Sequence, residues 1–400
     1  MNPRFGSAHF YGLLALGGAL VLIGLGSAHF MEEHGHVVTG MNNQVVWGLP
    51  HVFAIFMIVA ASGVLNVASI GSVFGQPVYK PRAPLSGLLC VAMLAGGLMV
   101  LMLDLGRPER LIVAATHYNL SSVFAWNVLL YSGMVAIVAL YLWTMFERSM
   151  NRYSKSAGLL ALVWRFVLTT GTGSIFGFLV ARQAYASAVL APLFIVLSFG
   201  WGLAVFLLVQ SAMYAWNGQT LDPAVQRRMA RLLGVFVAAS FYLVVVYHLT
   251  NLYFERQAEF EAFILLGRGN SGGIFPLLLW GGYALAGTAL PLLLLFHPRL
   301  GGPRTTQAAA ALVVLGAFAW LYVFIIGGQA FPLEIFPGYS ATSSFGDGAV
   351  AQYTPRWPEW LLGLGGVGAA FVLTTIGVRV LDFMPQDDFV ALKTDAKGVR

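Results

Sequence analysis

The chain has 400 residues, of which 58% are hydrophobic and only 10% are charged, and its mean hydropathy is +0.77. This composition excludes an ordinary soluble domain and indicates a polytopic membrane protein. The net charge of +6 does not point to nucleic acid, because the basic residues fall in short loops between apolar segments, where they orient a membrane protein. The single cysteine, Cys90, lies inside an apolar run, which excludes a disulfide framework and a cysteine-ligated iron–sulfur cluster built from this chain.

Ten apolar segments reach the roughly 20 residues that a helix needs to cross the hydrocarbon. In chain order we expect them near residues 11–30, 46–73, 85–103, 123–145, 159–180, 189–213, 232–254, 274–296, 308–326 and 360–381. The first segment has no convincing cleavage site and is followed by more spans, so we expect it to be retained. The sequence therefore predicts an all-α polytopic membrane protein of about ten transmembrane helices, with residues 1–382 as one membrane domain.

Loop charges predict the orientation, because Lys and Arg are retained on the cytoplasmic side. Even-numbered loops carry mostly basic residues, such as Arg148, Arg228 and Arg304, whereas odd-numbered loops hold most of the acidic ones. Ten spans then put the N and C termini in the cytoplasm, the latter in a short tail of residues 383–400. The longest outer loop, residues 327–359, is rich in aromatic residues, which favours a docking surface or a lid.

Polar and ionisable residues gather at the predicted outer ends of the second, third and fourth spans. The third span closes in the run Leu103 to Arg110, where Pro108 stops the helix and Gly106 lets the chain turn. We expect these residues to lie at one depth: Trp47, His51, Asp104, Arg107, His117, Tyr118, Asn119 and Asn127. Such groups near hydrocarbon are costly and often functional, although a solvated helix cap is the alternative interpretation.

The deepest charge belongs to Arg165, in the fifth span. Its side chain could extend to the cytoplasmic surface or serve a proton path, and we favour the first interpretation because a long side chain near a helix end reaches water easily. No Asp or Glu falls in the middle of a predicted span. The sequence therefore gives little support to a carboxylate relay that crosses the membrane within this chain.

Three stretches resemble the NrfD/PsrC family, whose members are membrane subunits of complex iron–sulfur redox enzymes. They are the run from Asp104 to Pro108, the start of the second span from Trp47 to His51, and the outer segment of residues 327–338. The ten-helix length is closer to the HybB-like and DsrP-like members than to the eight-helix type. The opening of the chain through the fourth span looks most similar to the DsrP members, which belong to Dsr electron-transfer complexes of sulfur metabolism.

The resemblance implies a menaquinone or ubiquinone site near the outer face, with no haem, iron–sulfur cluster or metal in the chain itself. It also implies a bacterial inner membrane location and a periplasmic iron–sulfur ferredoxin-like partner, with a multihaem cytochrome c and further membrane or cytoplasmic subunits in a Dsr-type complex. The protein would then exchange electrons between the quinone pool and the partner at the outer face, in dissimilatory sulfur metabolism. With no flavin motif or cluster cysteines, the chain would hand electrons to a partner cofactor.

A quinone headgroup needs hydrogen-bonding groups for its two oxygens and an acid or base for protons, beside an apolar slot for its tail. We assign His51, Asp104 and His117 as candidate proton-handling groups. Candidate headgroup contacts are Trp47, Arg107, Tyr118, Asn119 and Asn127. Of all these, Asp104 and Arg107, followed by Pro108, match the family run closely, and Arg107 could instead pair with Asp104 to hold the turn.

Three alternatives remain open. A haem-b anchor would use facing histidines as axial ligands; His29, His51, His117 and His248 are available, but they crowd the outer ends of the spans. A secondary transporter would be expected to show repeated halves and polar groups at the midplane, whereas the polar groups here gather at one face. A purely structural anchor without a quinone site is the third alternative.

Overall fold

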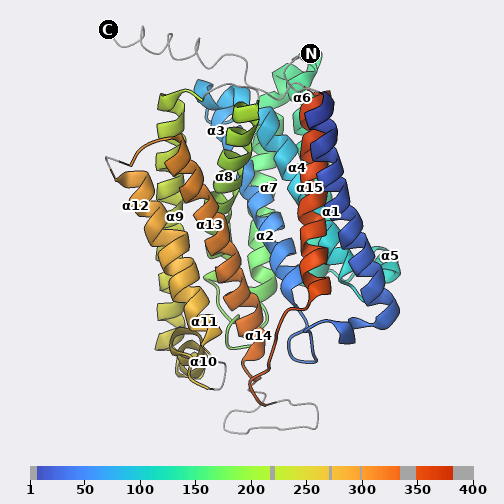
Figure 1. The fold of residues 1–400 in the computed structure, drawn as a ribbon, viewed down its shortest axis with the longest axis vertical. Helices are drawn as coiled ribbons and strands as arrows, with labels where there is room; N and C mark the ends of the chain where they lie inside the picture. The colour runs from blue at the N-terminus through green and yellow to red at the C-terminus, as the bar shows by residue number, and fades with distance from the viewer. Residues whose placement is uncertain (1–6, 217–220, 270–272, 298–299, 334–347, 382–400) are drawn as a thin grey trace.

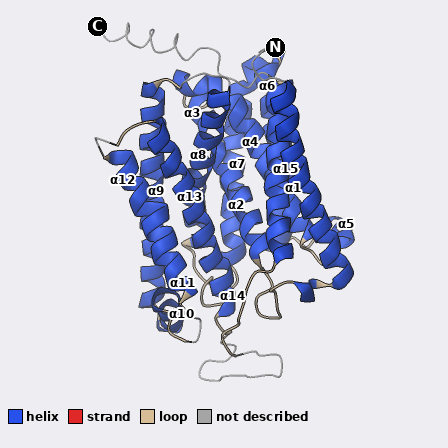
Figure 2. Ribbon diagram, in the orientation of Figure 1, coloured by secondary structure: helices blue, strands red, loops and turns tan. Residues whose placement is uncertain are grey.

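The computed structural model describes residues 7–216, 221–269, 273–297, 300–333 and 348–381. Within these ranges the regular structure is helical, as Figure 2 shows. Ten helices of the described part are long and apolar enough to cross a membrane. The all-helical fold and the number of spans expected from the sequence are therefore confirmed. Residues 334–347 of the expected outer loop and the expected tail of residues 383–400 lie outside the described residues.

The long helices stand side by side in one bundle, in which α1 and α15 are neighbours although they come from opposite ends of the chain (Figure 1). The spanning elements are α1 (Ser7–His34), α2 with α3 (Leu49–Val64, Asn66–Ser72), α4 (Ala83–Leu103), α6 (Val123–Phe146), α7 (Ser154–Gly177), α8 (Leu190–Trp216), α9 (Pro223–Tyr253), α11 with η5 and α12 (Ile274–Pro276, Leu277–Ala289, Leu290–Phe296), α13 with η6 and α14 (Pro303–Tyr322, Val323–Gly327, Gly328–Ala330) and α15 (Trp357–Val380). Shorter helices between them are η1 (His36–Val38), η2 (Pro77–Arg82), η3 (Pro108–Arg110), α5 (Leu111–Thr116), η4 (Arg148–Tyr153) and α10 (Glu255–Leu266).

The start of α2, the end of α4 and the short helices α5, α10 and α14 lie toward the same end of the bundle, the lower end in Figure 1. We call it the outer end after the orientation predicted from the loop charges, which remains a prediction. Residues that we expected from the sequence to lie at one depth are thus carried by helix ends and loops on one side of the molecule.

Helix α2 lies at the centre of the bundle, and most of its residues are buried against α4, α8 and α15. Two glycines bring α2 and α8 into backbone contact. A Cβ at Gly63 would lie 1.6 Å from the carbonyl oxygen of Ser198, and a Cβ at Gly202 would lie 2.2 Å from the backbone nitrogen of Val64. Small residues allow this approach, as is typical of membrane helix pairs. Helix α2 is therefore a fixed support for the side chains in its first turn.

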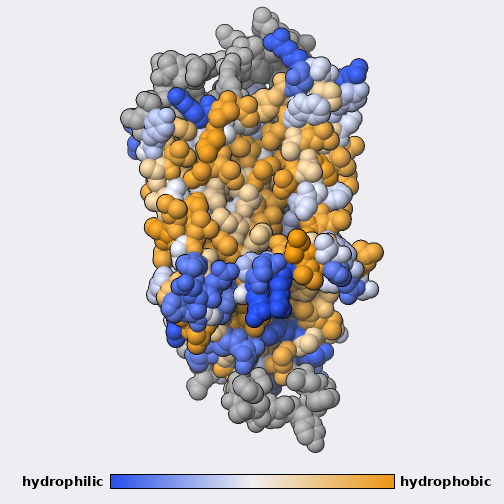
Figure 3. Space-filling model, turned by 90° about the vertical axis from the view of Figure 1, so that its right-hand side faces the viewer, coloured by the Kyte–Doolittle hydropathy of each residue, from blue (hydrophilic) through white to orange (hydrophobic). Residues whose placement is uncertain are grey.

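Apolar side chains cover the outside of the bundle, and Figure 3 shows them as a broad band on one face, with hydrophilic residues gathered toward the outer end. Exposed examples from six helices are Leu22, Leu129, Val163, Val235, Leu315 and Leu373. Apolar surface of this extent marks contact with lipid in a protein of this composition. The chain is a multi-pass membrane protein.

Several of the expected spans differ in detail from the structure, and the seventh and eighth are examples. Helix α9 begins at Pro223 rather than near residue 232, because the Asp222 side chain caps it by accepting hydrogen bonds from the next two available backbone N–H groups. The eighth span is not a single α-helix, since its central segment η5 is π-helical. Neither feature follows from hydropathy alone.

Arg165 does not extend to the surface, so the favoured interpretation of this residue was wrong. Its side chain is buried, and one guanidinium nitrogen lies 3.4 Å from the Ser62 carbonyl oxygen in α2. The guanidinium also lies over the rings of Phe166 and Phe199, at 4.7 and 5.4 Å from their centroids. A carbonyl and two aromatic faces inside the bundle thus offer this cation partners that the sequence pattern does not reveal.

Candidate functional site

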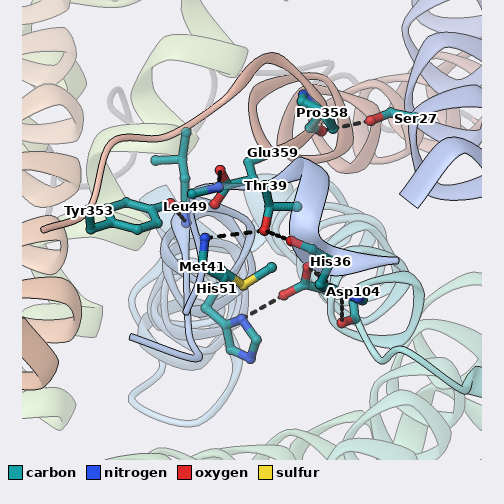
Figure 4. A network of polar contacts seen from close by, with 11 residues as sticks. Ser27, His36, Thr39, Met41, Leu49, His51, Asp104, Tyr353, Pro358 and Glu359 are labelled. Atoms are coloured by element: carbon teal, nitrogen blue, oxygen red, sulfur yellow. Dashed lines mark hydrogen bonds and ion pairs between the residues drawn. The ribbon is translucent and has the colours of Figure 1, made fainter. Parts of the chain in front are cut away.

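A histidine and a carboxylate form the centre of the polar cluster at the outer end. His51 Nδ1 lies 2.8 Å from Asp104 Oδ2, and the Asp104 side chain is only 1% exposed (Figure 4). Helix α2 begins at Leu49 with Pro50 as its second residue, which puts His51 in the first turn, whereas Asp104 is the residue that ends α4. Because α2 and α4 run in opposite directions, the start of one helix meets the end of the other. We call His51 and Asp104 the dyad.

The dyad has unused hydrogen-bonding capacity. Both carboxylate oxygens of Asp104 are buried, and neither makes a hydrogen bond of good geometry within the described structure. His51 Nδ1 is close enough for an ion pair but is not aligned for a hydrogen bond. Buried polar atoms of this kind call for an explanation, and a bound ligand that donates a hydrogen bond is one. The carboxylate therefore keeps acceptor capacity that no hydrogen bond among the described residues uses.

Two aromatic residues complete the surroundings of the dyad. The Trp47 indole stacks on the His51 imidazole, with centroids 5.8 Å apart and planes at 23°. His36 Nε2 lies 3.0 Å from the Asp104 carbonyl oxygen and 3.9 Å from its Oδ1. Trp47 was among the residues predicted from the sequence, whereas His36 was missed. The available signal was the position of His36 in the loop after the first span, on the same predicted side.

The other predicted residues are not brought to the dyad. Arg107 is exposed and makes no ion pair with Asp104 in the described part of the chain, so the pairing considered above does not occur. His117, Tyr118 and Asn119 are exposed, and their side-chain hydrogen bonds stay within residues 116–125 of their own segment. These four residues share the outer end with the dyad without contacting it.

Asn127 is buried in the second turn of α6. Its Nδ2 donates to the Val123 carbonyl oxygen at 2.8 Å, and its Oδ1 is buried without a hydrogen-bond partner in the described structure. Its amide faces the backbone of Gly171 in α7, where a Cβ would lie 3.4 Å from Oδ1. Asn127 is thus a packed residue with one free acceptor.

Gln329 fastens the chain just before α2. This side chain is 1% exposed, and its Oε1 accepts hydrogen bonds from the backbone nitrogens of Val46 at 3.1 Å and Trp47 at 3.0 Å. Its Nε2 donates to the carbonyl oxygens of Trp47 at 2.9 Å and Ile325 at 2.8 Å. Gln329 lies in the outer segment that resembles the family, but the sequence assigned it no role. The structure shows that it fixes the residue stacked on His51.

Arg182 joins the same support from the loop between α7 and α8. Its guanidinium donates to the carbonyl oxygens of Gln329 at 2.9 Å and Gln44 at 3.0 Å. Burial lowers the pKa of Arg182 from its ordinary value. The segment before α2 is therefore held from two sides, by the buried Gln329 and the half-buried Arg182, as preorganised sites require.

A second histidine and carboxylate lie at the outer end between α9 and α10. His248 Nδ1 is 2.7 Å from Glu261 Oε2, and Asn251 Nδ2 donates to Glu261 Oε1 at 2.7 Å. Glu261 was not assigned to any site from the sequence. The cavity beside His248 measures about 10 Å³ and is lined otherwise by apolar and aromatic side chains such as Trp320 and Phe324. It has room for about one water and none for a ring-sized ligand.

Comparison with known proteins gives relatives over almost the whole chain. The chain is 28% identical to the Hdr-like menaquinol oxidoreductase integral membrane subunit of Archaeoglobus fulgidus, with 92% of this chain and 94% of the relative covered. It is 27% identical to a putative dimethyl sulfoxide reductase membrane subunit of Halobacterium salinarum, with 96% and 93% covered. It is 22% identical to the menaquinone reductase integral membrane subunit of Nitratidesulfovibrio vulgaris, with 91% and 89% covered. The family model "Polysulphide reductase, NrfD" matches residues 37–333, and the chain therefore belongs to the NrfD family, as its motifs predicted.

Proposed function

We propose that this chain is the quinone-binding membrane subunit of a multisubunit redox complex, with the dyad as its quinone site. Two of the relatives carry menaquinol or menaquinone in their names, and the relatives are membrane subunits of oxidoreductases. The observation that carries the proposal is the buried Asp104 carboxylate, which lies 2.8 Å from His51 and makes no hydrogen bond of good geometry among the described residues. A quinol hydroxyl is a donor of the kind that this site lacks.

In this proposal the dyad accepts or donates the protons that accompany the quinone reaction. Oxidation of a quinol releases two electrons and two protons, and a positioned histidine or carboxylate can take a proton from the reacting hydroxyl. Trp47 supplies a flat apolar face beside His51, as a headgroup requires. The electrons pass to a partner's cofactor, since the single cysteine cannot hold a cluster.

The remaining candidate residues take different places in this proposal. Arg107, His117, Tyr118 and Asn119 would contact a headgroup only at the rim of the site, because they are exposed at the same end. Asn127 offers a buried acceptor further along the fourth span. We therefore place the proton-handling role on His51 and Asp104, and assign His117 to the rim.

Finer features are proposed from the resemblance to the DsrP members. They are a menaquinone or ubiquinone substrate, a role in dissimilatory sulfur metabolism, a bacterial inner membrane location, and docking of a periplasmic iron–sulfur ferredoxin-like protein with a multihaem cytochrome c. Affinity purification of the tagged chain from its native membrane, followed by mass spectrometry and a haem spectrum, tests the partners. Recovery of the chain alone with stoichiometric haem b would favour the haem anchor instead.

The quinone site is tested by binding of 2-heptyl-4-hydroxyquinoline N-oxide (HQNO), a quinol analogue, to the purified full chain, measured by fluorescence quenching. We expect saturable binding in the parent and loss of binding in His51→Ala and Asp104→Asn. His29→Ala is the matched control, because His29 is an exposed outer-end histidine paired with Glu33. Unchanged binding in the two dyad variants would move the site elsewhere. Absence of binding in the parent would favour a structural anchor or a transporter.

A further inference from the structure

The buried side chain of Glu359 and the half-buried side chain of Tyr353 connect to the dyad, and the proposed chemistry uses neither. Glu359 lies in the first turn of α15 and is 0% exposed, and Tyr353 lies in the segment that precedes this helix (Figure 4). Both residues lie beyond residue 333, where the match to the family model ends.

Glu359 is held by neutral donors. Its Oε2 accepts hydrogen bonds from the backbone nitrogens of Gly40 and Arg356, both at 2.8 Å, and its Oε1 accepts from the Tyr353 hydroxyl. Among the described residues it has no ion-pair partner. The donors and the N-terminus of α15 together stabilise the negative charge. The carboxylate thereby joins the start of α15 and the residues just before it to the segment that contains Gly40.

Tyr353 links Glu359 to the first turn of α2 through hydrogen bonds. Its hydroxyl donates to Glu359 and accepts the backbone N–H of Leu49 at 2.6 Å, which is one of the first-turn donors that a helix cannot satisfy by itself. Burial and, secondly, the neighbouring Glu359 charge raise the pKa of Tyr353 well above its ordinary value, so the hydroxyl keeps its proton. The first turn of α2 is thereby fixed two residues before His51.

A second series of contacts connects Glu359 to Asp104 through residues 36–40. The Gly40 bound by Glu359 follows Thr39, whose hydroxyl donates to the His36 carbonyl oxygen at 2.6 Å. The His36 ring in turn lies 3.0 Å from the Asp104 carbonyl oxygen. Figure 4 shows these groups in one continuous network around the start of α2. Glu359 therefore connects to both members of the dyad, to one through Tyr353 and to the other through residues 36–40.

The backbone at Gly48 shows how closely this network packs against α2. A Cβ at Gly48 would lie 2.5 Å from Glu359 Oε1 and 2.9 Å from the Tyr353 hydroxyl oxygen. A side chain at residue 48 would therefore have to displace Glu359 or Tyr353 from its present position. The two side chains therefore rest directly on the backbone that leads into His51.

We propose that Tyr353 and Glu359 are positioning residues, which set the separation of His51 and Asp104 without touching the quinone. The inference rests on the proposed function, since it gives the pair a role in quinone binding at the dyad. Displacing a catalytic group by about 1 Å costs up to about a hundredfold in activity, and loss of one supporting hydrogen bond is expected to cost up to about tenfold in affinity. Removing the Tyr353 hydroxyl is thus expected to weaken binding while the bundle stays folded.

The experiment measures HQNO affinity for the full chain in the parent, Tyr353→Phe, Glu359→Gln and His51→Gln. Tyr253→Phe is the control, because Tyr253 is an 87% exposed tyrosine at the outer end of α9. We expect about tenfold weaker binding in Tyr353→Phe and Glu359→Gln and no change in Tyr253→Phe. Glu359→Gln keeps the size of the side chain. If Tyr353→Phe does not fold, the affinity of Glu359→Gln is sufficient to test the proposal.

A double variant separates positioning from a general loss of structure. If Tyr353 acts through His51, then Tyr353→Phe has no further effect on affinity in the His51→Gln background. Equal losses in both backgrounds would overturn the positioning role. Unchanged affinity in Tyr353→Phe and Glu359→Gln, with binding weakened in His51→Gln, would overturn it and leave the proposed function standing. Unchanged affinity in His51→Gln would overturn both proposals, because the dyad would then not be the site.

Discussion

Replacing Gln329 by Leu should release the segment that leads into α2. The amide makes four hydrogen bonds while being almost fully buried, and three of them go to the backbone of Val46 and Trp47. Leu has nearly the same volume, so the change removes the hydrogen bonds without opening a large cavity. The backbone groups of Val46 and Trp47 would lose the side-chain partner that fixes them.

The expected cost follows from the number of hydrogen bonds. A typical intramolecular hydrogen bond contributes about 1 kcal/mol net, and a buried group left without a partner costs about 1–3 kcal/mol. Three lost bonds to residues 46–47 therefore lower the free energy of local opening by about 3 kcal/mol. Since about 1.4 kcal/mol corresponds to a tenfold change in an equilibrium constant, the open state gains about a hundredfold in population.

Hydrogen exchange followed by mass spectrometry reads this opening directly, on a peptide that covers residues 44–52. Gln210→Leu is the matched control, because Gln210 in α8 is equally buried and neither end of its amide has a hydrogen-bond partner in the described structure. We expect about a hundredfold faster exchange in Gln329→Leu and little change in Gln210→Leu. Equal exchange in the two variants would refute the reasoning that Gln329 holds this segment.

Three further predictions concern other parts of the structure. Gly48→Ala should weaken HQNO binding and lower the thermal midpoint, because its Cβ would lie 2.5 Å from Glu359 Oε1; a variant with parent-like values would contradict the close approach. Asp222→Ala should lower the free energy of unfolding by about 1 kcal/mol, measured by thermal unfolding against Asp222→Asn, which keeps a capping oxygen. Glu261→Leu should destabilise the outer end by about 3 kcal/mol or more, because the side chains of His248 and Asn251 would lose their carboxylate partner; stability equal to the parent would show that the pair contributes nothing.

The sequence predicted the parts of this structure that depend on local features. Hydropathy predicted the ten spans, because a helix in lipid needs a long apolar segment whatever it packs against. Pro108 predicted where the third span stops, and that helix end meets the first turn of α2 at His51 and Asp104. The predicted membrane depth of a residue was a weaker indicator of whether it belongs to the site. It placed His117 correctly near the outer end but could not tell that its side chain does not contact the dyad.

The parts that were missed depend on contacts between distant segments. Gln329 and Trp47 are hydrogen-bonded although 282 residues separate them, and nothing in either local pattern indicates this. Glu359 meets Gly40 across a similar distance in sequence. Arg165 is buried because aromatic and carbonyl groups of other helices surround it. Such contacts are set by how helices cross, which the hydropathy pattern does not specify.

Photoaffinity labelling tests most directly whether the quinone binds at the dyad. The complex in its native membrane would be labelled with an azidoquinone, digested and analysed by mass spectrometry, with excess HQNO as competitor. We expect competed label on peptides that contain residues 47–51 or Asp104. Competed label confined to other regions, such as residues 248–261 beside the second carboxylate, with none near His51, would contradict a quinone site at the dyad.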